Sequence, residues 1–170
     1  MNTKRLWAGL LITALVALQA VTVPAKGNSN VSNEQKIIGS WMVTVSPESA
    51  PTTFQGLLTF TDDGGVVASA QGDVLLNAPP GIVAVASAGH GAWAKTRPHE
   101  YSFTFRQIFY DSDGNLQGGA KIRGLSRMNP NGDEWSGSFQ VERFDAFGNV
   151  VFEGQGTQQA SRIKVEPLTL

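Results

Sequence analysis

The side chains of this chain that could do acid–base chemistry or bind a metal are few and scattered. Its two histidines are His90, in the segment Gly89-His90-Gly91-Ala92-Trp93, and His99, in a turn that contains Pro98. A histidine at the rim of a pocket could contact a ligand or act as a general base. For His90, a polar rim residue that bonds to a loop carbonyl is the simpler interpretation and is favoured. His99 is expected to be an exposed turn residue. With no carboxylate cluster beside either histidine, the sequence predicts no metal site.

Arg106 interrupts an aromatic segment that runs from Tyr101 to Tyr110. If its side chain pointed inward, the buried cation would need an acidic ligand or a protein carboxylate. The alternation of Tyr101, Phe103 and Phe105 defines the core face of this segment and places Arg106 on the other face. The outward orientation is therefore favoured.

Other charged clusters are explained without a catalytic role. The Asp-Ser-Asp-Gly-Asn segment at residues 111–115 begins like a calcium loop, but the remaining ligands of that motif are missing, so a turn is predicted. Lys121, Arg123 and Arg127 share one face of a predicted strand and indicate a solvated stripe. The chain has no serine in a nucleophile-elbow setting, no phosphate-binding glycine motif and no convincing pair of acids.

The elements that must position these residues are β-strands. Apolar and polar residues alternate through several segments, and this period of two places one set of side chains on a core face and the other towards solvent. Clusters of Asp, Asn and Gly separate the segments and are typical of tight turns. The predicted strands cover residues 37–46, 53–61, 65–76, 90–96, 100–110, 115–128, 134–144 and 149–164.

The number of strands and the short turns predict the fold class. An all-β meander of this length closes most economically into an eight-stranded up-and-down antiparallel barrel, which leaves no exposed edge. A β-sandwich is the alternative, although sandwiches usually need longer crossovers between their sheets. One connection, residues 77–89, is long, uncharged and apolar. It is expected to be a lid over one mouth of the barrel or an additional strand, and the lid is favoured.

The N-terminal residues are predicted to be a cleaved secretory signal. Lys4 and Arg5 precede an uncharged, largely apolar segment at residues 6–23, and Val23-Pro24-Ala25 ends it with a small residue at a cleavage position. Leu18-Gln19-Ala20 is a second option for cleavage. A retained membrane anchor is the alternative. The expected organisation is a signal peptide at 1–25, a flexible leader at 26–35 and a single β-barrel domain at 36–166. The protein is thus expected to be exported, periplasmic or secreted, with no stable membrane anchor after cleavage.

Composition excludes several kinds of partner and cofactor. The chain has no cysteine, which excludes thiol chemistry, thiolate zinc sites and iron–sulfur clusters, and the fold must be stable without disulfides. The formal net charge is −1, with 13 Lys and Arg against 14 Asp and Glu. This balance gives no indication of the basic patch that binds nucleic acid. No cofactor is predicted, and the sequence leaves the oligomeric state open.

Two short motifs resemble the lipocalins and the wider calycin superfamily. Gly39-Ser40-Trp41 matches the Gly-x-Trp motif at the start of the first strand, and Arg162 matches its partner on the last strand. The resemblance spans residues 36–164 and implies that Trp41 plugs one end of the barrel with Arg162 packed across the indole. Typical lipocalins have a C-terminal helix and a long loop after the first strand, and this chain shows neither. Small exported bacterial proteins of undefined function also share the Gly-Ser-Trp opening and a Gly-His-Gly-x-Trp segment.

The predicted barrel and this resemblance imply a protein that holds a hydrophobic small molecule. The interior is expected to contain Phe54, Leu58, Phe103, Phe105, Phe139 and Val141, for which plain core packing is the simpler explanation. The predicted ligand-binding residues are His90, Trp93, Tyr101, Phe103, Phe105, Arg106 and Phe139.

A barrel-type cyclase or isomerase acting on a hydrophobic molecule is the alternative function. Some calycin-like and allene-oxide-cyclase-like barrels shape a reactive ligand with few catalytic groups, so missing motifs do not exclude an enzyme. The candidates for such chemistry are His90, Tyr101, Arg106 and Glu142, without assigned catalytic roles. Fold alone does not choose between the two functions.

Overall fold

The computed structural model describes residues 36–70 and 85–169. The predicted signal peptide and leader lie outside the described residues, and so do residues 77–84 of the predicted lid. Every regular element in the described part is a β-strand. That part holds no helix long and apolar enough to cross a membrane.

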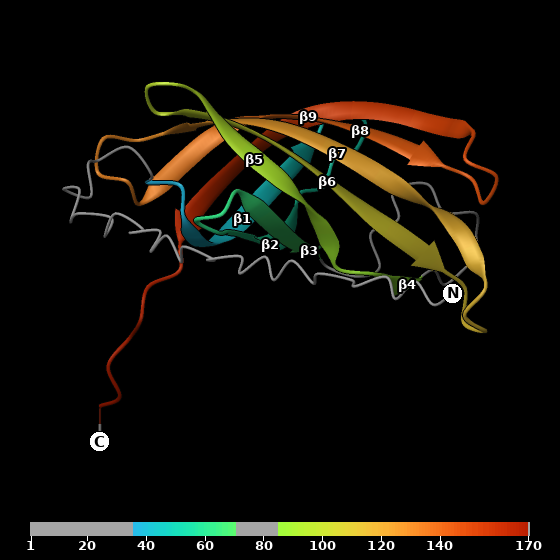
Figure 1. Ribbon diagram of the computed structural model, residues 1–170, viewed down its shortest axis with the longest axis horizontal. Helices are drawn as coiled ribbons and strands as arrows, with labels where there is room; N and C mark the ends of the chain where they lie inside the picture. The colour runs from blue at the N-terminus through green and yellow to red at the C-terminus, as the bar shows by residue number, and fades with distance from the viewer. Residues whose placement is uncertain (1–35, 71–84, 170) are drawn as a thin grey trace, which may run out of the picture. The chain divides into compact units, whose positions relative to one another are not determined.

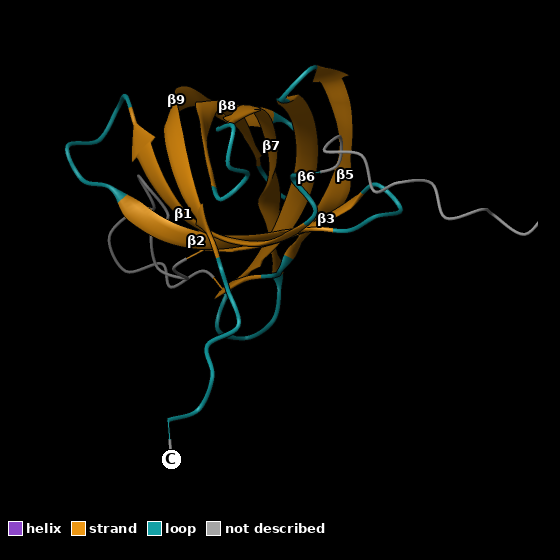
Figure 2. Cartoon of the chain, turned by 90° about the vertical axis from the view of Figure 1, so that its left-hand side faces the viewer, coloured by secondary structure: helices purple, strands orange, loops and turns teal. Residues whose placement is uncertain are grey.

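Nine strands make up the described fold, and eight of them close into a barrel. They are β1 (Gly39–Pro47), β2 (Phe54–Phe60), β3 (Gly65–Ala70), β4 (Val85–Ala86), β5 (Gly89–Arg97), β6 (Glu100–Tyr110), β7 (Leu116–Met128), β8 (Glu134–Phe144) and β9 (Val150–Arg162). The barrel order is β1-β2-β3-β5-β6-β7-β8-β9, every pairing is antiparallel, and β9 pairs back onto β1 (Figure 1). Figure 2 shows these strands curving round a common interior. The predicted up-and-down barrel is confirmed, and the sandwich alternative is wrong because one sheet closes on itself.

The remaining strand, β4, lies beside the barrel on the end of β6. Its two residues pair with Tyr110 and Phe109. Ser87 continues the contact, because its backbone N–H donates to the Ile108 carbonyl at 2.8 Å and its hydroxyl accepts from the Ile108 N–H at 3.0 Å. The predicted lid therefore ends in a short additional strand, which was the less favoured expectation for this segment.

Alternate residues of each strand fill the barrel. On β6, Tyr101, Phe103, Phe105 and Phe109 are buried, whereas Thr104 is exposed. A closed sheet buries one face in this way and hydrates the other, and it leaves no free edge. Aromatic side chains from strands distant in sequence consequently meet in one core.

One end of the barrel is closed around Trp41. This side chain is fully buried, with 0% of its surface exposed, and its Nε1 donates to the Ile37 carbonyl at 2.8 Å. Arg162 lies across the indole with its Cζ 4.2 Å from the ring centroid, so the predicted contact is present. The negative face of the ring attracts the cation. Edge-to-face contacts join Trp41 to Trp135 and Trp135 to Phe103.

Arg162 also fastens the chain that enters β1. Its Nη1 donates to the Ile38 carbonyl at 2.7 Å, its Nη2 donates to the Lys36 carbonyl, and its Nε donates to the Gly132 carbonyl at 2.9 Å. Gly39 has a φ of +123°, and a Cβ at this position would lie 2.6 Å from Arg162 Nη1. Any side chain here would strain the backbone and displace the guanidinium. This geometry gives the Gly-x-Trp spacing a physical basis.

Two turns at the other end of the barrel share one hydrogen-bond pattern. In residues 111–115 and 145–149, the first Asp accepts hydrogen bonds from backbone N–H groups two and four residues later, at 2.8 to 3.0 Å. The closing Asn donates its side-chain N–H to the same carboxylate. That side-chain bond, followed by the backbone bonds, holds the pKa of Asp111 and of Asp145 below its ordinary value. Residues 111–115 therefore form a turn, as predicted.

Candidate functional site

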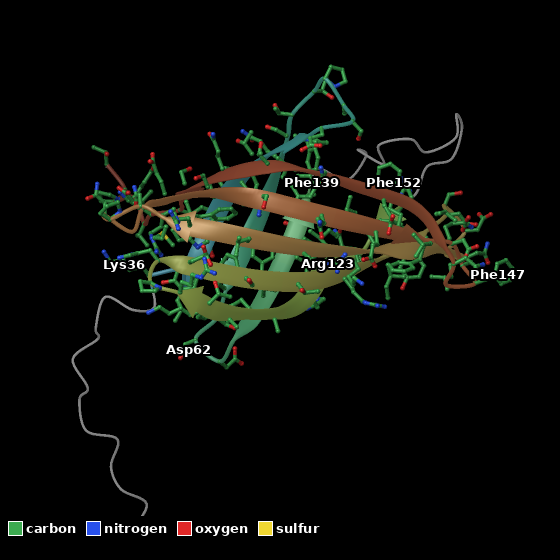
Figure 3. The ribbon with its side chains drawn as sticks, turned by 90° about the horizontal axis from the view of Figure 1, so that it is seen from above. Lys36, Asp62, Arg123, Phe139, Phe147 and Phe152 are labelled. Atoms are coloured by element: carbon green, nitrogen blue, oxygen red, sulfur yellow. The ribbon has the colours of Figure 1, made fainter. Side chains whose placement is uncertain are left out.

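A cavity of about 180 Å³ lies inside the barrel, away from Trp41. Its lining comes from the ends of β1, β3, β6 and β8 and from the starts of β2, β7 and β9, which are the strand ends opposite the closed end, together with Ala86 of β4. Figure 3 shows this axis, with Lys36 at the closed end, Phe147 at the other end, and Phe139 and Phe152 between them. This space is called the distal cavity below.

The walls of the distal cavity are mostly apolar. Small residues occupy several inward positions on facing strands, among them Gly56, Ala68 and Ala120, and they leave the space that larger side chains would fill. A space of this kind suits an apolar group better than water. Its larger apolar lining residues are Val43, Val45, Phe54, Leu57, Leu58, Phe105, Phe109, Ile122, Phe139, Val141 and Phe152.

Four residues with long polar side chains also line the cavity: Gln107, Arg143, Gln155 and Gln158. The amide of Gln158 donates to the Ser138 carbonyl at 3.2 Å, and that of Gln107 donates to the Ser87 carbonyl at 3.3 Å. Both amides are thus oriented by backbone groups. Arg143 is the one charged residue among the described lining residues.

Phe105 and Phe139 are the two predicted ligand-binding residues that line the distal cavity. They come from β6 and β8, and both are buried. Phe105 stacks on Phe103, with ring centroids 6.2 Å apart. Phe105 therefore stands between the cavity and the aromatic core of the closed end.

Trp93, Tyr101 and Phe103 lie on the closed side of that boundary and do not line the cavity. The Trp93 Nε1 donates to the Thr61 carbonyl at 2.9 Å, and its ring lies 5.9 Å from that of Tyr101 in an edge-to-face contact. These side chains hold each other in a packed cluster. They share the inward face with Phe105 and Phe139 but not the distal cavity, because the inward face of a strand extends over both ends of the barrel.

His90 and Arg106 lie on the outside of the barrel. They form a cross-strand pair on β5 and β6, and both are exposed. Arg106 points outward as its strand phase predicts, and its Cζ lies 5.5 Å from the centroid of the Phe144 ring. Neither residue lines the distal cavity, so the expected contact of His90 with a molecule in the mouth has no support from its position.

The four residues considered for catalysis do not meet in one site. Tyr101 is buried at the closed end, whereas Glu142 sits among cations on the outer face. Glu142 lies 2.5 Å from the Lys121 ammonium and also pairs with Arg123. The hydrogen bond from Lys121 is the largest of the causes that lower the Glu142 pKa. A carboxylate held ionised in this way is a poor general acid.

The predicted site omitted several residues that line the cavity. The alternation of inward and outward residues along the strands could have identified some of them. Extending the alternation of Phe103 and Phe105 along β6 reaches Gln107 and Phe109, and extending that of Phe139 along β8 reaches Arg143. On β9 the inward positions include glycines such as Gly154 and Gly156, which interrupt the alternation of apolar and polar residues. The sequence pattern therefore does not identify Phe152 and Gln158 as cavity residues.

Neither a metal centre nor a known family explains the cavity. Within residues 36–70 and 85–169, no group of three or more His, Asp or Glu side chains is placed to hold a metal ion. The chain matches no protein-family model, no curated protein and no solved structure.

Proposed function

We propose that this protein binds a small hydrophobic molecule in the distal cavity. The observation that carries the proposal is an apolar space of about 180 Å³ in a barrel whose other end is packed with aromatic rings. An apolar cavity of about 150 Å³ in another protein stays dry and binds benzene. The distal cavity is therefore suited to enclose a group the size of one ring or a short alkyl chain, and the remainder of a larger molecule would lie outside it.

Burial of such a group supplies a moderate driving force. Each buried methylene contributes about 0.8 kcal/mol, so a six-carbon chain contributes about 5 kcal/mol. The loss of translational and rotational freedom on association offsets much of this gain. A ligand that binds tightly must therefore make contacts beyond those of its enclosed apolar part.

The closed end supports the same proposal through its likeness to calycins. Gly39, Trp41 and Arg162 combine a buried indole, a stacked guanidinium and a glycine that leaves room for it. We also propose that the protein belongs to the calycin superfamily and that it is exported after removal of residues 1–25. A carrier is preferred to an enzyme because the candidate catalytic residues do not face the cavity.

A cavity-filling variant tests the proposal. Ala120 is buried on β7 and lines the cavity, so Ala120→Leu should occupy part of the space and abolish or sharply weaken binding of N-phenyl-1-naphthylamine, followed by its fluorescence. Thr104→Leu adds a similar side chain on the outer face of β6 and should leave binding unchanged. Equal binding by both variants would show that the probe does not use the distal cavity.

Identification of the natural ligand needs a second experiment. The protein should be purified under native conditions and its small molecules extracted for mass spectrometry. An apolar compound recovered from the parent but not from Ala120→Leu is the expected result. Conversion of that compound by the purified protein would instead establish an enzyme.

A further inference from the structure

We propose that the protein forms a symmetric dimer through the outer face of strands β6 to β9, and that a row of complementary charges on this face selects a second copy of the chain. Figure 3 shows these strands side by side from above, with Arg123 labelled among them. The contact lies on the outside of the barrel, so the inference does not depend on the proposed ligand.

One row of charged side chains crosses this face from strand to strand. Each member is the cross-strand partner of the next, and all take the outward phase: Arg106 on β6, Lys121 on β7, Glu142 on β8 and Glu153 on β9. The two cations are direct neighbours, and so are the two carboxylates. Like charges directly opposite each other destabilise a sheet, whereas an alternating order would pair every charge within the chain. The stability of a single barrel therefore does not explain this order.

The two ends of the charged row have no ion-pair partner within residues 36–70 and 85–169. The middle of the row is paired, because Glu142 lies 2.5 Å from the Lys121 ammonium. Arg106 contacts the Phe144 ring instead of a carboxylate, and Glu153 is exposed. The row thus offers an unpaired cation at one end and an unpaired carboxylate at the other.

Two such rows match each other under one kind of two-fold axis. Neighbouring strands lie about 4.8 Å apart, so the midpoint of the row falls between β7 and β8. A two-fold axis that runs along the strands at this midpoint places Arg106 over the partner's Glu153 and Lys121 over the partner's Glu142. A symmetric contact of this kind uses the same patch on both copies. An axis that ran across the strands would instead place each charge over its own copy, and repulsion disfavours that arrangement.

The next row towards the open end of the barrel is apolar and fits the same axis. It consists of Ile108, Gly119, Phe144 and Val150, which are again successive cross-strand partners. The side chains of Ile108 and Val150 are 44% and 51% exposed. The axis places Ile108 against the partner's Val150, and it places Phe144 over the partner's Gly119, where no side chain covers the strand. The dimer would therefore bury apolar surface beside its charge pairs.

The shape of the barrel limits the size of this contact. Its wall curves away on both sides of the row, which confines the interface to a few strands (Figure 2). Small interfaces are weak, so we expect a dimer that dissociates on dilution. Because the axis runs along the strands, the open ends of the two barrels lie on the same side of the dimer and stay free.

Sedimentation velocity of the purified protein, over a dilution series at low and high salt, tests the proposal. The parent should show a concentration-dependent dimer that weakens as salt is added, since salt screens exposed charges. Arg106→Glu and Glu153→Arg should each weaken dimerisation at least about tenfold. Each reversal places like charges together, and the symmetry repeats it twice in the contact. Circular dichroism checks that these surface variants stay folded.

The variant that carries both changes, Arg106→Glu with Glu153→Arg, should restore the dimer, because the exchanged charges again face opposite charges. Within one chain the two positions are three strands apart, roughly 14 Å, so restoration must come from contact between copies. Glu134→Arg is the control. Glu134 is an exposed carboxylate at the other end of β8, outside the row, and its reversal should leave dimerisation unchanged.

Three results would overturn the proposal. The first is a parent that stays monomeric at high protein concentration and low salt. The second is a dimer that both single reversals leave intact. The third is loss of the dimer in both single variants without its return in the charge-exchanged variant, which would place the contact between copies elsewhere.

Discussion

Single residues decide how one end of this barrel is closed. Trp41 is fully buried, bonds to the Ile37 carbonyl and carries Arg162 on its face. Arg162 in turn bonds to three backbone carbonyls of the segments that meet there. Removal of the indole would leave both a cavity and a buried guanidinium without its aromatic partner.

Trp41→Ala should therefore lower the free energy of unfolding by about 3–5 kcal/mol, the range for a large aromatic side chain removed from a core. Urea unfolding followed by circular dichroism measures the loss. Phe147→Ala is the control, because the Phe147 side chain is 91% exposed and its loss should cost less than about 0.5 kcal/mol. A cost below about 1 kcal/mol for Trp41→Ala would contradict the role of Trp41 in closing the barrel.

At the scale of elements, the turn at residues 145–149 predicts a pH dependence. Hydrogen bonds from Asn149 and the turn backbone lower the folded-state pKa of Asp145 below 3.8. The ionised carboxylate therefore stabilises the fold above the ordinary pKa of Asp, and this contribution is lost as the pH falls through the lowered value. Asp145→Asn should be less stable than the parent at neutral pH.

The stability difference between the parent and Asp145→Asn should shrink on acidification, because the parent then loses the same charge. This difference is measured from the urea unfolding midpoints of both proteins, from neutral pH to below the ordinary pKa of Asp. Asp113→Asn is a useful control, since Asp113 contributes its backbone N–H to the neighbouring turn. A difference that stays constant over this pH range would contradict the role of the Asp145 carboxylate.

Strands and turns were predictable from the sequence, whereas depth along the barrel was not. The predicted strands at 100–110 and 134–144 coincide with β6 and β8, since large alternating side chains end at Asp, Asn and Gly clusters. Alternation assigns a residue to the inner or outer face, but Phe103 and Phe105 share that face and lie on opposite sides of the cavity boundary. The position of a residue along the barrel axis depends on which strand ends lie at the Trp41 end. That arrangement is set only when the whole sheet closes into a barrel.

At the scale of the whole molecule, the described barrel has two chemically different ends. Aromatic rings and the Arg162 hydrogen bonds fill one end, and the distal cavity lies towards the other. Without cysteines, the stability of the fold must come from this packing and from the closed hydrogen-bonded sheet. A ligand is therefore expected to enter from the end away from Trp41.

The proposed export predicts a specific N-terminus. The exported protein should begin near Lys26, because the segment that ends at Ala25 has the three-part organisation of a secretory signal. N-terminal sequencing of the protein recovered outside the cytoplasm measures this directly. Recovery of intact Met1 in a membrane fraction would show instead that the segment is an anchor.

Methyl NMR during titration with N-phenyl-1-naphthylamine reports on whether an apolar molecule binds in the distal cavity. The methyl resonances of Ala120, Ile122 and Val141, which line the cavity, should shift together and saturate. Those of Val66 and Met128, which are buried in the closed-end core and do not line the cavity, should stay in place. Shifts confined to the closed end or to exposed side chains, or no saturable shift, would contradict binding in the distal cavity.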